Sequence, residues 1–181
     1  MAAGRRIGVL GLGNVLMGDD ALGPYVIGLL QARYRFEEGV SVEDLGTPGL
    51  DLHPHLQGLD SLILVDTVRS EGEPGQVHTY RRDQILRHAP AQRVSPHDPG
   101  VKEALLALEF AGEGPDEVLL VGVIPDNVEQ SVGLTPPVQA AVPIVVYEVL
   151  AELERLGYTP AAYDPPREPD LWWERPATPV C

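Results

Sequence analysis

The sequence predicts a single α/β domain in which a twisted, mostly parallel sheet is sandwiched between helices in three layers. Three observations predict this fold class. The chain has 181 residues, which suits one domain with a substantial core. Short unbroken apolar runs, typical of strands buried on both faces, alternate along the chain with segments of helical spacing. Glycine and proline contribute 19 and 18 residues, so many turns are expected between these elements.

The first part of the chain is predicted to supply three strands and two helices. Residues 7–10 are apolar and end in a Gly-x-Gly-Asn turn, which is typical of a buried strand that enters a tight turn. Residues 25–34 have apolar side chains at helical spacing, and Asp19 or Asp20 offers an N-cap before them. The remaining elements of this part are a strand at 40–44, a short helix within 51–59, and the clearest buried strand at 62–65, which Asp66 closes.

The second part is predicted to add two strands, two helices and a proline-rich tail. A strand on the far side of the sheet is expected at 77–80, an amphipathic helix at 101–110 and a buried strand at 118–124. The longest helix, about 136–156, opens with two prolines, which fit the first helical turn. We therefore divide the chain into an α/β domain, residues 1–157, and an irregular C-terminal tail, residues 158–181.

Charge and cysteine content exclude several classes of protein. Lysine and arginine total 13 against 27 acidic residues, and the net charge of −14 argues against nucleic acid and anionic membrane surfaces as partners. The single cysteine is Cys181, which excludes an internal disulfide framework and a cysteine-based metal cluster. No apolar run approaches the roughly 18 residues of a membrane span, and the start does not resemble a signal peptide. We expect a cytoplasmic protein without membrane insertion.

Polar residues stand where predicted strands and helices meet. Asp20 heads the first helix, Asp66 follows the strand at 62–65, and His97 lies in a Ser-Pro-His-Asp-Pro-Gly segment before another helix. Because the carboxyl ends of parallel strands share one edge of a sheet, these three side chains can meet there. Two carboxylates and one imidazole suit a divalent transition metal. Taken alone, each residue also has a structural explanation, which is capping of a helix or turn for the two aspartates and ordinary hydrogen bonding for His97.

Other sites are less well supported. Gly11-x-Gly13 partly matches a dinucleotide fingerprint, but Leu16 replaces its third glycine. Asp19 and Asp20 also stand where a pyrophosphate would bind, and their carboxylates repel phosphate. No G-x-S-x-G nucleophile is present, so a hydrolase of this sequence would use water activated by a metal or a carboxylate.

Five segments, in order, resemble the motifs of the hydrogenase maturation endopeptidases, which process the large subunit of [NiFe]-hydrogenases. They are residues 11–23, the acid-then-Gly-Thr-Pro-Gly loop 44–49, the strand 62–66, the histidine loop 95–97, and 121–125 with 133–136. The resemblance runs from about Ile7 to Gly157. It implies a phosphorylase/hydrolase-like fold and removal of a C-terminal extension from the large-subunit precursor after nickel insertion.

The resemblance also implies the site residues. The family's three metal-contacting positions correspond to Asp20, Asp66 and His97, which we expect to be both catalytic and metal-binding. Some members have Glu at position 20, and Asp sets the carboxylate back by about one methylene group. Nickel is expected to be carried by the substrate, and other divalent metals can substitute for it.

The loop that follows the second strand is the expected substrate-binding segment. Two glycines flank a Thr-Pro pair there, and such a loop lets a peptide backbone approach closely. Its expected binding residues are Asp44, Gly46, Thr47 and Gly49. An ordinary turn capped by the aspartate is the alternative.

Two other functions are compatible with the sequence. A peptidyl-tRNA hydrolase also begins with a strand and a Gly-x-Gly-Asn turn, but it needs a basic RNA-facing surface, which the net charge of −14 opposes. A non-catalytic, nickel-dependent docking or chaperone module would bind the large subunit without cutting it. The sequence does not separate docking from cleavage.

Overall fold

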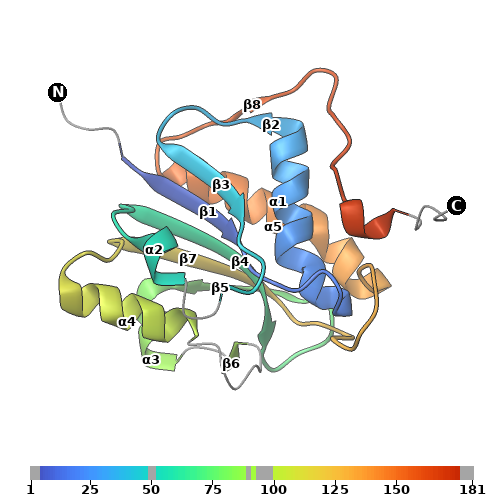
Figure 1. Ribbon diagram of the computed structural model, residues 1–181, viewed down its shortest axis with the longest axis horizontal. Helices are drawn as coiled ribbons and strands as arrows, with labels where there is room; N and C mark the ends of the chain where they lie inside the picture. The colour runs from blue at the N-terminus through green and yellow to red at the C-terminus, as the bar shows by residue number, and fades with distance from the viewer. Residues whose placement is uncertain (1–4, 49–51, 89–90, 93–99, 176–181) are drawn as a thin grey trace, which may run out of the picture.

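The structure, a computed structural model, describes residues 5–48, 52–88, 91–92 and 100–175 (Figure 1). Its central sheet runs in the order β3-β1-β4-β7-β5, and β6 pairs with the end of β4. Pairing is parallel from β3 to β7 and antiparallel for β5 and β6. The strands are β1 (Ile7–Gly11), β3 (Val40–Asp44), β4 (Ser61–Arg69), β5 (Val77–Arg81), β6 (Ala91–Gln92) and β7 (Glu117–Val123).

Helices cover both faces of this sheet, as Figure 1 shows. Alternate residues of β4 serve the two layers, since Ile63 and Val65 pack with one apolar cluster and Leu62 and Leu64 with the other. The first cluster contains α1 (Leu22–Arg33) and α5 (Pro136–Arg155); the second contains α2 (Leu52–Leu56), α3 (Arg82–His88) and α4 (Val101–Ala111). The predicted α/β sandwich is confirmed.

Strand β4 is longer than the sequence indicates, and this changes the place of Asp66. The strand continues to Arg69, with Asp66 opposite Gly122 and Thr67 opposite Val123 of β7. The other neighbour, β1, ends earlier, at the pair Gly11–Val65. The prediction that Asp66 closes the strand is therefore wrong: it lies inside β4, one residue beyond the end of β1.

The start of α1 also differs from the prediction. A short 3-10 turn, η1 (Gly18–Ala21), precedes the helix, and Ala21, which has no side-chain acceptor, occupies the N-cap position. Asp19 and Asp20 are fully buried within η1. The prediction that one of them caps the helix is wrong, because both carboxylates are hydrogen-bonded to more distant parts of the chain.

The described part of the tail packs along α1. Strand β8 (Ala161–Ala162) pairs antiparallel with β2 (Tyr34–Arg35), and a 3-10 turn, η3, spans Trp172–Glu174. The Tyr158 hydroxyl accepts a hydrogen bond from the Glu37 amide. A methyl group on Gly28 of α1 would lie 3.3 Å from Leu171, so the absence of a side chain there allows the tail to lie close. Two short regular elements thus occur in a segment expected to be irregular.

An ion-pair network ties α5 to the amino edge of the sheet. Glu152, which is buried, accepts hydrogen bonds from Arg81 at 2.5 and 2.8 Å and from Arg155 at 3.0 Å. Arg155 also pairs with Glu117, which binds Arg5 at 2.5 Å. Burial alone would raise the pKa of Glu152, but hydrogen bonds from Arg155 and Arg81 hold it below its ordinary value. The hydrogen bond from Arg155 likewise lowers the pKa of Glu117.

Helix α5 is the one described helix that is long and apolar enough to cross a membrane by length and composition. No such stretch was expected from the sequence. In the structure its apolar stripe packs into the core with α1 and the sheet, through Val138, Val142, Val145, Val149 and Leu153.

Candidate active site

The turn between β1 and η1 is held tightly against both neighbouring strands. The Leu12 amide donates to Val65 of β4 at 2.9 Å, and the Gly13 amide donates to Gly46 after β3 at 2.8 Å. Gly13 has a φ of 145°, and a side chain there would begin 1.8 Å from the carbonyl oxygen of Asp20. Only glycine lets the backbone of Asp20 come this close to the end of β1.

Asp20 is fully buried at this turn. Its Oδ2 accepts the Asn14 amide at 2.7 Å, and its Oδ1 accepts the Thr67 hydroxyl at 3.3 Å. Its carboxylate therefore links the loop after β1 to the end of β4.

Asp66 is 3% exposed, and its Oδ1 accepts the amide of Thr67 at 2.7 Å. Burial raises the pKa of Asp66 well above its ordinary value, and the Thr67 amide opposes this shift only in part. Among the described residues, that amide is the one hydrogen-bond donor to this carboxylate. A buried carboxylate with so few donors is stabilised by a proton or by a cation.

Thr67 connects the two aspartates. Its amide donates to Asp66 and its hydroxyl to Asp20, and it is itself buried. The structure thus brings Asp20 and Asp66 together around one residue, at the edge where β1 ends. Thr67 was not predicted from the sequence. The predicted strand ended at Asp66, so Thr67 fell outside it and had no expected structural role. The available signal was that Thr67 and Val68, two β-branched residues, follow Asp66 directly and can continue the strand.

Asp19 has a different role from its neighbour. Its carboxylate accepts the amides of Asp126 and Asn127 at 2.8 and 2.9 Å, and both the amide and the hydroxyl of Thr135 at 2.6 and 2.9 Å. These donors belong to the loop between β7 and α5 and to the first residue before α5. Asp19 therefore fixes that loop against η1, a role that was not predicted from the sequence.

The predicted substrate loop adjoins the same turn. Asp44 is exposed, and its Oδ1 accepts the Gly46 amide at 2.9 Å, which is the turn-capping contact. Gly46 has a φ of 57° and receives the Gly13 amide, and Thr47 is exposed. Gly49 and His97 lie outside the described residues. Asp44, Gly46 and Thr47 are thus close to the chain that carries Asp20.

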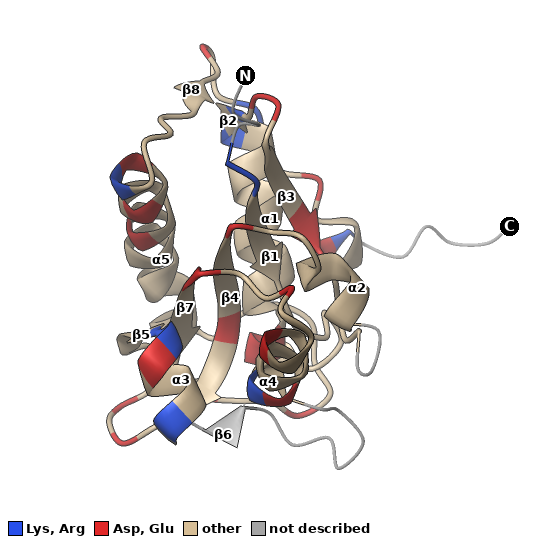
Figure 2. Cartoon of the chain, turned by 90° about the vertical axis from the view of Figure 1, so that its left-hand side faces the viewer, with Lys and Arg blue, Asp and Glu red and all other residues tan. Residues whose placement is uncertain are grey.

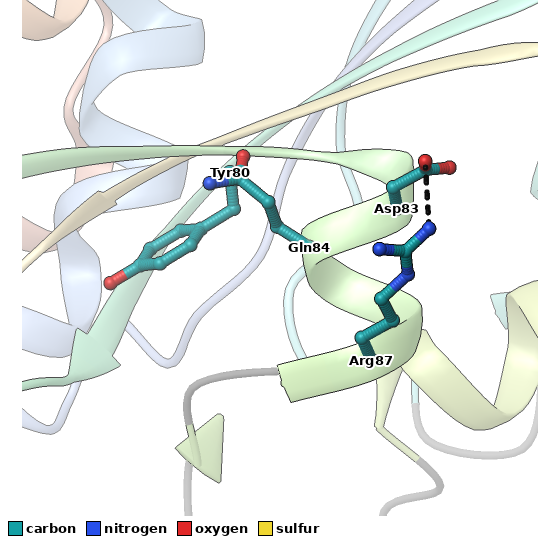
Figure 3. Close-up of a pocket in the computed structure, with 4 residues that line it drawn as sticks. All are labelled: Tyr80, Asp83, Gln84 and Arg87. Atoms are coloured by element: carbon teal, nitrogen blue, oxygen red, sulfur yellow. Dashed lines mark ion pairs between the residues drawn. The ribbon is translucent and has the colours of Figure 1, made fainter.

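The described residues contain no group of three or more His, Cys, Asp or Glu side chains placed to hold a metal ion. Of the three predicted metal ligands, Asp20 and Asp66 lie within the described residues, and both provide hard oxygen donors. A separate hollow of about 310 Å³ is lined by Tyr80, Asp83, Gln84 and Arg87, as Figure 3 shows. These four residues are not among the predicted site residues, and Asp83 and Arg87 form an ion pair at 3.5 Å.

The fold and the paired buried aspartates describe an α/β enzyme whose site lies at the carboxyl edge of a parallel sheet. The family model described as "Hydrogenase maturation protease" (HycI) matches residues 24–152. The chain is 37% identical over 152 residues to the hydrogenase 2 maturation protease of Escherichia coli K12, covering 84% of this chain and 93% of that protein. It is 38% identical over 157 residues to the hydrogenase expression/formation protein HoxM of Azotobacter vinelandii, covering 86% and 76%.

The same relationship holds in three dimensions. The structure of the hydrogenase maturating endopeptidase HybD from E. coli matches with a TM-score of 0.82 at 35% identity, covering 88% of this chain and 99% of that one. The chain belongs to the hydrogenase maturation protease family. The resemblance seen in the sequence and the assignment to the endopeptidases are confirmed, and family membership decides against the peptidyl-tRNA hydrolase alternative.

Proposed function

We propose that this endopeptidase removes the C-terminal extension of a [NiFe]-hydrogenase large-subunit precursor after nickel has been inserted. The observation that carries the proposal is the pair of buried carboxylates, Asp20 and Asp66, held on either side of Thr67. Membership of a family of hydrogenase maturation proteases supports a hydrogenase precursor as the substrate.

In this proposal the nickel belongs to the precursor and is part of the substrate. Burial already disfavours the ionised form of Asp66, so a cation beside it offsets the hydration that the carboxylate has lost. Asp20 supplies a second carboxylate, which is hydrogen-bonded to the same residue, Thr67. With the imidazole of His97 they form a set of two oxygens and one nitrogen, which suits nickel and other divalent metals. The set has no thiolate, so we expect weak, reversible metal binding by the free enzyme.

This arrangement supports a mechanism based on positioning. Asp20, Asp66 and His97 hold the precursor through its nickel, so that one peptide bond lies at the edge of the sheet. A carboxylate at this edge then acts as the general base: it accepts a proton from the water that attacks the carbonyl carbon, and the proton passes to the departing amine as the C–N bond breaks. The loop residues Asp44, Gly46, Thr47 and Gly49 bind the precursor's backbone beside the β1 turn. Recognition of the metal explains how a protease whose sequence lacks a G-x-S-x-G nucleophile cuts one bond of one protein.

The proposed setting of the reaction is the cytoplasm. Acidic residues are spread over several helices and loops, as Figure 2 shows, and the net charge is −14. We propose that the enzyme acts there without nucleic acid and without insertion into a membrane.

The test is an incubation of the enzyme with nickel-loaded and with nickel-free precursor, followed by intact mass measurement. The loaded precursor should lose the mass of its extension, and the nickel-free precursor should keep it even at high enzyme concentration. Equal cleavage of both forms would contradict nickel recognition, and an uncut loaded precursor would contradict the proposed substrate. Glu154→Gln, an exposed change near the end of α5, serves as a control that keeps wild-type cleavage.

A further inference from the structure

Three large apolar side chains are exposed on the two segments that surround η1. Leu16 is 50%, Val128 is 39% and Val132 is 54% exposed. Leu16 belongs to the turn after β1, and the two valines belong to the segment between β7 and α5. We call these three residues the apolar rim. Such side chains are costly to leave in water, at about 25 cal/mol for each Å² of apolar surface.

The apolar rim stands on backbone that is fixed. The Ser131 amide donates to Leu16 at 3.1 Å, and the Gly18 amide donates back to Ser131 at 2.9 Å. Asp19 holds the Asn127 amide at 2.9 Å, and the Asn127 side chain accepts the Glu129 amide at 2.9 Å. Figure 1 shows the two segments side by side near the start of α1. A surface built in this way is ready to receive a partner without first being ordered.

The apolar rim is also joined to the candidate site. The Leu16 amide donates to the Asn14 side chain at 3.0 Å, and the Asn14 amide donates to the Asp20 carboxylate at 2.7 Å. Leu16 therefore lies two residues from a direct donor to Asp20. The apolar rim therefore adjoins the loop that binds the Asp20 carboxylate.

We propose that Leu16, Val128 and Val132 dock an apolar segment of the hydrogenase precursor next to its cleavage site. This inference rests on the proposed function and adds the surface that binds the protein part of the substrate. Exposed Asp126 and Glu129 lie on either side of Val128 in the sequence, so the segment should carry basic residues beside its apolar centre. The rim then contributes affinity for the polypeptide, while the two aspartates contribute selectivity for its nickel.

The test compares Leu16→Ser with Val132→Ser, singly and together, in binding and in cleavage of the nickel-loaded precursor. The double variant should weaken precursor binding and raise KM about tenfold, with kcat within about twofold of wild type. Phe110→Ser is the matched control, because Phe110 is 98% exposed on α4 and should change neither constant.

The outcomes separate this inference from the proposed function. Unchanged precursor affinity in the double variant would overturn the docking role, as would a fall in kcat without a change in KM. Sedimentation gives a further check on the docking role. If the wild type is a dimer and the double variant is a monomer, the surface binds a second copy of the chain, and the docking role is overturned. Nickel-independent cleavage with weakened binding in the double variant would overturn the proposed nickel recognition but leave the docking role intact.

Discussion

Replacing Asp19 with alanine should release the segment between β7 and α5 from its contacts with η1 and so destabilise the fold. The Asp19 carboxylate is fully buried and accepts four hydrogen bonds, three of them from backbone amides. Hydrogen bonds to a charged group contribute about 1.5–3 kcal/mol each, and losses within one group add incompletely. Because water can reach part of the loop in the variant, we expect a loss of about 3–5 kcal/mol in the free energy of unfolding.

Urea denaturation at pH 7 measures this loss, with thermal unfolding as a second assay. For a domain of this size the loss corresponds to a fall in Tm of roughly 6 to 20 °C. The stability of Asp19→Asn should lie between those of wild type and Asp19→Ala. Its side-chain oxygen still accepts hydrogen bonds, but its NH2 group faces other donors. Asp126→Ala is the control and should change stability by less than about 0.5 kcal/mol, since its side chain is exposed. A loss below about 1 kcal/mol for Asp19→Ala would refute the reasoning.

Three further predictions concern positioning, substrate contact and acid stability. Thr67→Val should lower kcat/KM for precursor cleavage by about 10- to 100-fold, whereas Thr67→Ser keeps most of it; equal rates in both variants would remove the role of the hydroxyl. Asp44→Asn should reduce cleavage while Tm stays within about 2 °C, and unchanged cleavage would leave Asp44 as a turn cap. Glu152→Gln should cost about 1–3 kcal/mol at pH 7. Because the pKa of Glu152 is lowered in the folded state, this stabilisation is present above the unfolded value of about 4.3 and is lost as pH falls through the folded value. The difference between Glu152→Gln and wild type should therefore shrink toward pH 3, and a constant difference would contradict the assignment.

The central strands were predictable because their burial on both faces demands continuous apolar residues. The runs at 7–10 and 118–124 correspond closely to β1 and β7. The end of β4 was not predictable in the same way, because an acid within a strand normally ends it. Asp66 is accommodated there since β1 has already ended and the Thr67 amide binds its carboxylate.

The site was predictable in part for a similar reason. Asp20 follows the end of β1, and Asp66 lies one residue beyond that end in the neighbouring parallel strand β4, so the parallel topology brings them to one edge. The role of Asp19 was hidden, because its partners Asp126, Asn127 and Thr135 lie 107 to 116 residues away in the chain. Nothing in the local sequence distinguishes a helix cap from an acid that holds a distant loop.

Asp66→Asn offers the most direct test of the central claim, that a buried carboxylate is retained for recognition of the precursor's metal. Burial raises the pKa of Asp66 in the folded state, so its ionisation lowers stability as pH rises above the unfolded value of about 3.9. Asparagine keeps the shape and an acceptor for the Thr67 amide but cannot ionise. The variant should therefore be at least as stable as wild type at pH 7 and should leave nickel-loaded precursor uncut. Cleavage by Asp66→Asn at the wild-type rate would contradict the account.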